Sequence, residues 1–125
     1  MATKFATSKQ DELILPLAAR TATNNSTFTC ATTGGLFIID VSAVTATPSV
    51  VFKIQGMLPD TGNTWDILTS AAITGTGTTI LRVYPTLTAA ANTIAQDILP
   101  QAIRINAIHA DTDSITYSVR FVGCN

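Results

Sequence analysis

The most evident shortage in this 125-residue sequence is charge, since only 12% of its residues are Asp, Glu, Lys or Arg. Seven basic and eight acidic residues leave a formal net charge of -1, so no bulk field attracts nucleic acid or an anionic membrane. Hydrophobic residues make up 46%, which excludes a disordered chain and requires burial inside the protein or against partners. We therefore expect one domain with its own core, and neither nucleic acid nor membrane as a partner.

Long apolar runs are also absent from the sequence. The longest, such as residues 35–39 and 49–52, fall far short of the roughly 20 residues that span a bilayer. The first ten residues carry two lysines but lead into Asp11 and Glu12 rather than into the apolar segment of a signal peptide. The sequence thus predicts a soluble protein without an export signal.

Residues suited to metal binding or nucleophilic catalysis are scarce, with one histidine, His109, and two cysteines, Cys30 and Cys124. The cysteines form no C-x-x-C pair. They either close one large disulfide loop or, in our preferred interpretation, stay reduced as small hydrophobes in a cytoplasm, with Cys124 exposed at the terminus. His109 precedes a turn containing Asp111 and Asp113, which we interpret as turn residues rather than as partners of a catalytic base or ligands of a cation. We predict no enzyme, and no catalytic, cofactor-binding or metal site.

Threonine is the most conspicuous residue that is present, with 22 copies, and together with Val and Ile it favours extended backbone. Alternating apolar positions predict one or two strands within 19–31, and further strands over 36–44, 50–55, 64–69, 80–84, 102–109 and 115–121. Turn-forming residues at 58–63 and 111–113 predict two hairpins. Residues 85–100 have weak helical spacing and are predicted as a loop with at most one helical turn.

Short strands without long helices between them predict an all-β fold, an antiparallel β-sandwich that is immunoglobulin-like or jelly-roll-like, with about seven or eight strands. We assign residues 19–125 to this sandwich. Residues 1–18 are predicted to form an extended N-terminal arm, whose apolar residues need a surface to lie on: Leu13, Ile14, Leu15 and Leu17. Trp65, in the first hairpin, is predicted to fill the core or an interface, with stacking on a sugar ring as the alternative.

A family resemblance rests on several segments: Ala19-Arg-Thr-Ala-Thr23, Ile39-Asp-Val-Ser-Ala-Val-Thr-Ala-Thr-Pro-Ser-Val50, Phe52-Lys-Ile-Gln-Gly56, Trp65-Asp-Ile-Leu-Thr-Ser-Ala-Ala-Ile73, Leu81-Arg-Val-Tyr-Pro85 and Asp111-Thr-Asp-Ser-Ile-Thr-Tyr-Ser118. Through them the chain resembles a family of small structural proteins of tailed bacteriophages and prophages, most of which have no assigned role. The resemblance covers roughly residues 18–120. The first 17 residues and the closing Phe-Val-Gly-Cys-Asn lie outside the pattern, so a partner contact particular to this chain is expected there.

The resemblance implies a virion component that is assembled in the host cytoplasm, without a cofactor. Its implied partners are the major capsid protein or other virion proteins, and a homo-oligomer is expected. Our first hypothesis is a capsid decoration (cement) protein that binds the capsid lattice through Leu13, Ile14, Leu15, Leu17 and Trp65. The alternatives are a head-fibre base, a tail or connector component, and a carbohydrate-binding adhesion module.

Overall fold

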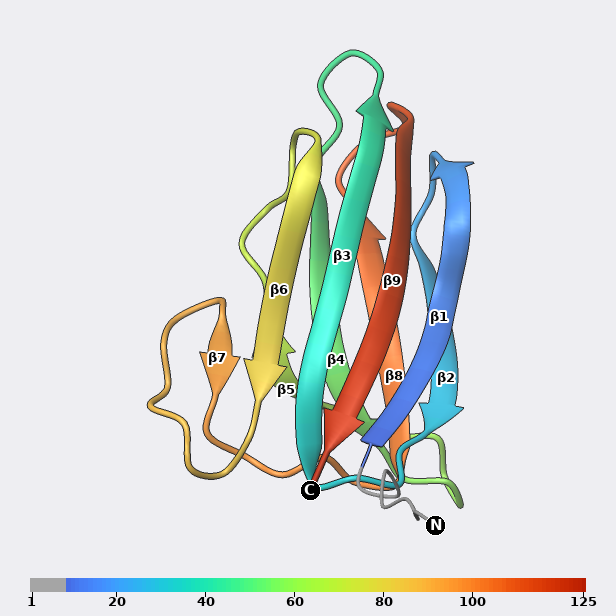
Figure 1. The fold of residues 1–125 in the computed structure, drawn as a ribbon. Coiled ribbons are helices and arrows are strands. Elements are labelled where there is room, and N and C mark those ends of the chain that lie inside the picture. The colour runs from blue at the N-terminus through green and yellow to red at the C-terminus, as the bar shows by residue number, and fades with distance from the viewer. Residues whose placement is uncertain (1–8) are drawn as a thin grey trace, which may run out of the picture.

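Nine β-strands in two packed sheets make up the computed structural model, which describes residues 9–125 (Figure 1). The strands are β1 (Lys9–Arg20), β2 (Asn24–Thr29), β3 (Gly34–Val44), β4 (Val50–Met57), β5 (Thr64–Thr69), β6 (Gly77–Val83), β7 (Ile94–Ala95), β8 (Ala102–His109) and β9 (Ile115–Cys124). One sheet has the order β1-β9-β3-β6-β7 and the other β2-β8-β4-β5. The predicted β-sandwich is confirmed, with nine strands instead of seven or eight. No helix within residues 9–125 is long and apolar enough to cross a membrane.

The strand pairing is that of a jelly roll. β4 and β5 form a hairpin around residues 58–63, and outward from it β3 pairs with β6, β2 with β8, and β1 with β9, all antiparallel. The first half of the chain thus pairs with the second half in reverse order, and successive pairs alternate between the two sheets. Of the two sandwich types that the sequence left open, the jelly roll is the one observed.

The core lies between the two sheets and is built from alternate positions of the strands, as the sequence predicted. Its largest fully buried side chains come from β3, β4, β6, β8 and β9: Tyr117, Phe37, Phe52, Phe121, Ile39, Ile54, Leu81, Ile103, Ile105, Ile115, Val50 and Val83. Burying a side chain of this size contributes about 1.5–3 kcal/mol. Strict alternation along residues 36–44 places Ala43 inward, but it is exposed because the pairing of β3 with β9 shifts register between Val41 and Ala43.

The expected hairpin between residues 102–109 and 115–121 is wrong, although both strands exist. β8 belongs to the four-stranded sheet and β9 to the five-stranded one, so the intervening turn carries the chain across the sandwich instead of pairing its flanking strands. The aspartates of this turn do bind backbone, because Asp111 Oδ1 accepts from the Asp113 N–H at 3.0 Å and Asp113 Oδ2 accepts from the Thr47 N–H at 3.1 Å. Their interpretation as turn residues is confirmed.

Residues 9–18, which we expected within an arm, form most of β1 at the edge of the five-stranded sheet (Figure 1). The predicted boundary at residue 18 therefore lies inside a strand; residues 1–8 lie outside the described part of the chain. The Gln10 side chain joins the two sheets here, because its Nε2 donates to the Thr29 carbonyl at 2.8 Å and its Oε1 accepts from the Ala31 N–H at 2.7 Å. Pro16 and two register shifts interrupt the regular ladder of β1, which protects an edge strand from pairing with other chains.

Residues 85–100 contain the two-residue strand β7 and no helix. Asn92 has a φ of 65°, in the left-handed region that asparagine tolerates better than most residues. This conformation turns the loop back so that Ile94 and Ala95 pair with Arg82 and Val83 of β6, the one parallel pair among the described strands. Of the apolar residues with helical spacing, Leu87 and Ile94 are partly buried but Ala91 and Ile98 are exposed, so the spacing does not mark one buried face.

The two cysteines are separate free thiols in the described structure, Cys30 buried and Cys124 exposed. The Cys30 Sγ lies 3.3 Å from the Thr32 carbonyl oxygen. Cys30 is part of the core cluster, where it packs as a small hydrophobe.

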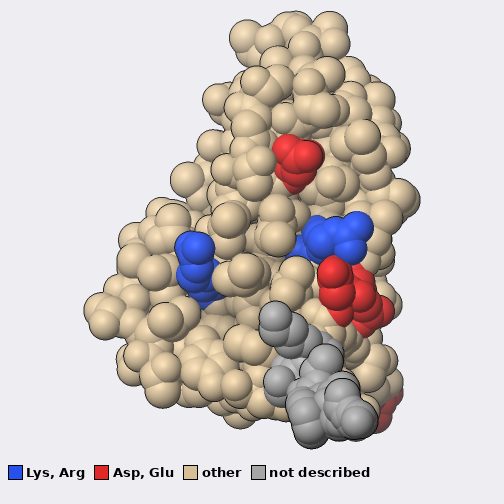
Figure 2. Space-filling view, viewed as in Figure 1, with Lys and Arg blue, Asp and Glu red and all other residues tan. Residues whose placement is uncertain are grey.

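The outer face of the five-stranded sheet carries few charged groups. It faces the viewer in Figures 1 and 2, and Figure 2 shows a few acidic and basic groups on a largely uncharged surface. Arg120 on β9 and Asp11 on β1 form an ion pair on this face, with 2.7 Å between Nη1 and Oδ1. Both side chains are about half exposed, so the pair contributes little to stability.

Candidate functional site

Among residues 9–125, Trp65 is the aromatic side chain with the greatest exposure, at 44%, and it lies at the start of β5 beside the hairpin turn. It pairs with Gly56 of β4, and the six-membered ring of its indole occupies the space into which a side chain at position 56 would project. Glycine at this position therefore lets the ring lie directly against the β4 backbone. The arrangement holds the indole in place while leaving much of its surface open to solvent.

A register shift between Ile54 and Gln55 determines which way the residues of β5 point. Leu68 pairs with Ile54 and is buried, whereas Asp66 pairs with Gln55, so one extra residue lies between these two pairs. Without the shift, alternation from Leu68 would put Asp66 in the core. With it, Asp66 reaches the outer face and Trp65 lies on the inner side, at the end of the sandwich.

A hollow of about 390 Å³ opens beside Trp65 at this end of the sandwich. Its wall combines the hairpin turn with the end of β2 and the beginning of β8, and the lining residues are Thr29, Met57, Leu58, Pro59, Trp65, Pro100, Gln101 and Ala102. Leu58 is 45% exposed here, and Ile98 of the loop that leads into β8 is 58% exposed. The lining contains no charged side chain, so this hollow suits an uncharged or apolar ligand surface.

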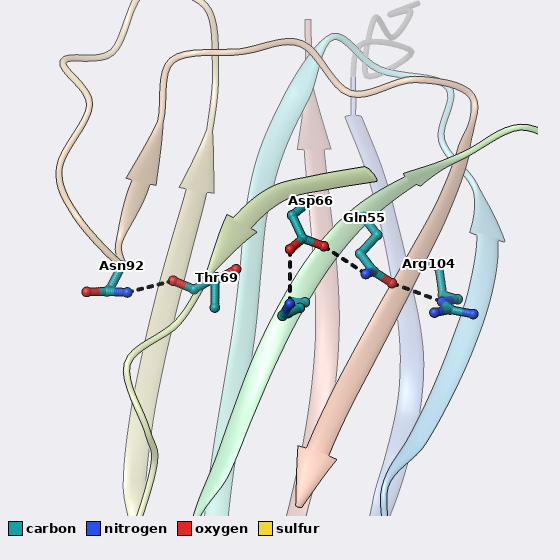
Figure 3. A network of polar contacts seen from close by, with 6 residues as sticks. Gln55, Asp66, Thr69, Asn92 and Arg104 are labelled. Carbon is teal, nitrogen blue, oxygen red and sulfur yellow. Dashed lines mark hydrogen bonds and ion pairs between the residues drawn. The ribbon is translucent and has the colours of Figure 1, made fainter. Parts of the chain in front are cut away.

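Four polar side chains on the outer face of the four-stranded sheet hold the Trp65 hairpin in register (Figure 3). Arg104 Nε donates to Gln55 Oε1 at 3.0 Å, Gln55 Nε2 donates to Asp66 Oδ1 at 2.8 Å, and Lys53 Nζ lies 3.0 Å from Asp66 Oδ2. The hydrogen bond from Gln55 and then the one from Lys53 lower the pKa of Asp66 below its usual range. Because these groups belong to β4, β5 and β8, the network ties the exposed hairpin to the interior of the sheet.

The loop before β7 contacts the free edge of β5 at the last residue of the strand (Figure 3). Asn92 Nδ2 donates to the Thr69 carbonyl oxygen at 3.0 Å. The left-handed backbone of Asn92 places this amide beside β5, so a side chain completes a hydrogen bond that no strand provides. The carboxyl-terminal end of β5 is thereby held on its free side as well as by β4.

A second hollow, of about 340 Å³, lies on the five-stranded sheet. It is lined by Gly35, Leu36, Arg82, Val83, Tyr84, Leu87, Cys124 and Asn125. Its lining is also mostly apolar, but it includes the Arg82 guanidinium. The C-terminal residues Cys124 and Asn125 contribute to this wall.

The five predicted partner-binding residues fall into three environments. Leu13 and Leu17 are exposed at 49% and 57%, whereas Ile14 and Leu15 belong to the core at 8% and 7%. The register shifts of β1 between Leu13 and Leu15 and between Leu15 and Ala18 turn two successive residues inward, which strict alternation does not predict. Trp65 lies on the opposite edge of the sandwich from β1, so the structure does not bring the two predicted contact regions together.

His109, the one histidine, belongs to a partly buried cluster around the buried Tyr117. Its Nε2 lies 2.9 Å from the hydroxyl of Tyr117, which also accepts from Asn24 Nδ2 at 2.8 Å. Burial, and then the positive charge of Arg20, lower the pKa of His109, and burial raises the pKa of Tyr117. The Arg20 guanidinium lies 4.6 Å from the centre of the Tyr117 ring, so these polar groups satisfy one another. No group of three metal-ligating side chains occurs in residues 9–125.

Comparison with known proteins adds no assignment to this geometry. No family model, curated protein or solved structure matches the chain. The candidate site is therefore defined by its own residues alone.

Sequence reasoning singled out Trp65 but missed the residues that form the hollow with it. Leu58 and Pro59 were assigned to a turn, and Ala102 to the start of a distant strand. Their meeting depends on β4 pairing with both β5 and β8, which local patterns do not specify. The one available signal was the apolar Leu58 inside an otherwise polar turn, where an exposed aliphatic side chain has no folding role.

Proposed function

We propose that this chain is a structural protein of a tailed bacteriophage virion, with capsid decoration as its first role. The observation that carries the proposal is the hollow at one end of the sandwich, which has no charged side chain in its lining and beside which Trp65 and Leu58 are exposed. Large exposed apolar side chains around a concave surface are typical of protein-binding sites. The proposal also rests on the resemblance to phage proteins stated above.

The jelly-roll pairing supports the proposal by analogy. Viral capsid domains and lectins both use this architecture, although a fold alone does not assign a function. A small, weakly charged sandwich on a repeating lattice gains strength from many copies, so each contact can be weak. The proposed role requires no catalysis, in keeping with a histidine that is engaged in the Tyr117 cluster.

Mass spectrometry of purified virions of the source phage tests the assignment. A copy number comparable to that of the major capsid protein supports capsid decoration, and a much lower number supports a fibre-base, tail or connector role. Absence from the particles overturns the virion assignment.

Co-sedimentation of the purified chain with particles that lack it tests the contact residues. Leu58→Ser and Trp65→Ala address the hollow, and Leu13→Ser with Leu17→Ser address the predicted β1 contact without removing the strand. Deletion of residues 1–17 would remove most of β1, so point changes at exposed positions are the sharper tool. Undiminished binding by the Trp65 and Leu58 variants, with their melting temperatures checked, would exclude the hollow from the contact.

A carbohydrate-binding role is the second candidate, favoured by the indole of Trp65. An aromatic ring fixed against a strand backbone, with polar Thr29 and Gln101 in the adjoining wall, can stack on a sugar and donate or accept hydrogen bonds. A glycan array with the wild-type chain, Trp65→Ala and Trp65→Phe tests this role. Binding that Trp65→Phe retains and Trp65→Ala loses would support a glycan ligand, and no binding by the wild type would exclude it for the glycans tested.

A further inference from the structure

The centre of the exposed face of the five-stranded sheet is aliphatic. Ile38 of β3 pairs directly with Ile80 of β6, and both side chains are only partly buried. Leu36 and Val122, which pair across β3 and β9, extend this centre on the same face. Partly exposed aliphatic side chains in contiguous positions of one face form an apolar patch that a partner can cover.

Two exposed charges flank this centre in opposite directions along the strands. Arg82 lies two residues from Ile80 on β6 and pairs with Leu36, whereas Asp40 lies two residues from Ile38 on β3 and pairs with Thr78. Among residues 9–125 neither charge takes part in an ion pair. Asp40 accepts only a 3.3 Å hydrogen bond from the Thr78 hydroxyl, so a cation and an anion are both available at the surface.

We propose that two copies of this chain associate face to face through this sheet, about a two-fold axis that passes by the Ile38–Ile80 pair. The two charges lie on opposite sides of the apolar centre, each displaced by two residues. A two-fold axis in the plane of the interface therefore brings Arg82 of each copy to Asp40 of the other, while Ile38 and Ile80 of both copies meet in the middle. This reciprocity is the property that a two-fold interface requires.

The geometry of the sheet fits this arrangement. Four residues along the strand and one strand spacing across it separate the Arg82 and Asp40 positions by roughly 14 Å. When Arg82 of each copy lies over Asp40 of the other copy, the strands of the two facing sheets cross at about 40°. This angle is close to the roughly 30° of aligned sheet packing. Two further charges on this face, Arg120 and Asp11, are already paired with each other within each copy.

Self-complementarity is the reason to choose a second copy over another occupant. An unrelated acidic or basic partner would need to match only one of the two charges, whereas a copy of the same chain matches both. This inference concerns a different face from the Trp65 hollow, and it holds whether or not the chain is a virion protein.

Sedimentation velocity over a range of protein concentrations tests the proposal with three variants. Arg82→Asp and Asp40→Arg each place like charges opposite one another and are expected to weaken dimerisation more than about tenfold. The double variant Arg82→Asp/Asp40→Arg restores opposite charges and is expected to dimerise like the wild type. An equimolar mixture of the two single variants is expected to form a heterodimer, because each copy then supplies the charge that the other lacks.

Asp60→Arg, an exposed change in the hairpin turn, is the matched control and is expected to leave association unchanged. The three substituted positions, 40, 60 and 82, are all exposed, so circular dichroism is expected to show a native fold for every variant. A wild-type chain that stays monomeric at high concentration overturns the proposal. So does a dimer that the single variants leave intact, or that the mixture of single variants does not restore.

Discussion

The contact between Trp65 and Gly56 can be tested by adding a single methyl group. In Gly56→Ala the new Cβ would meet the indole at distances that real Cβ atoms essentially never show, for example 2.7 Å from Cη2. The neighbouring ring atoms would be closer still, so the indole has to leave its position. The β4 backbone is anchored between β5 and β8 and cannot move as easily as a side chain with two rotatable bonds.

The size of the effect follows from the area that the indole has buried. Trp65 is 44% exposed, so roughly half of a surface of up to about 250 Å² returns to water, which costs about 3 kcal/mol. Replacing glycine by alanine inside a strand returns up to about 1 kcal/mol through backbone entropy. We expect Gly56→Ala to lower the free energy of unfolding by about 2 kcal/mol.

Urea denaturation measures this change, and fluorescence reports its cause. Trp65 is the sole tryptophan of the sequence, so a shift of the emission maximum to longer wavelength would report directly that the indole has entered water. Gly75→Ala is the matched control, since nothing lies within 4 Å of its added Cβ. In a Trp65→Ala background, Gly56→Ala should become neutral or stabilising. Wild-type stability and emission in Gly56→Ala would refute the proposed packing.

Three further predictions concern the other polar contacts. The lowered pKa of His109 means that the unfolded chain binds the proton more tightly, so stability should fall as the pH drops from about 6.5 towards the folded pKa; His109→Gln should flatten that slope in denaturation curves between pH 7.5 and 5. Tyr117→Phe removes the buried hydroxyl shared by His109 and Asn24 and should cost about 1–2 kcal/mol in urea denaturation. Asn92→Gly keeps the left-handed turn but loses the bond to Thr69, so in thermal melts it should destabilise less than Asn92→Ala, which loses both.

Each of these predictions has an outcome that contradicts it. Carboxylates titrate below the pH range of this experiment. If stability still falls with pH in His109→Gln, a group other than His109 causes the pH dependence. Unchanged stability in Tyr117→Phe would mean that the hydrogen bonds of this hydroxyl in the folded protein are no more favourable than its hydrogen bonds to water in the unfolded chain. Equal destabilisation by the alanine and glycine variants at position 92 would show that the hydrogen bond, rather than the backbone conformation, carries the effect.

The face that each strand buries could be predicted from the sequence, because alternation depends only on neighbouring residues. Phe37, Ile39 and Leu81 are buried as expected. Ile14 and Leu15 show the limit of this reasoning, since a register shift in the β1–β9 pairing decides that both point inward. That shift depends on β9, more than 100 positions away, and a local pattern contains no information about it.

Which strands pair could not be predicted. A turn has the same composition whether the two strands that flank it pair with each other or belong to different sheets. Asp111 and Asp113 bind backbone in a turn between sheets, as they would in a hairpin. The turn at 58–63 does join paired strands, and the same reasoning succeeded there. The candidate hollow was out of reach for the same reason, since it needs β8 to lie beside β4.

The pairing order connects the candidate site to the fold itself. The antiparallel pairs β4–β5, β3–β6, β2–β8 and β1–β9 are nested around the 58–63 turn, so the long antiparallel ribbon closes at this turn. Later pairs join segments that are far apart in the sequence and depend on the earlier ones to bring them together. The residues of the hollow thus lie at the point where the chain must fold tightly, which explains why Gly56, Gln55 and Asp66 fix the hairpin so firmly. An exposed Trp65 and Leu58 at this position are not needed to close the turn, and their exposure is what a binding surface requires.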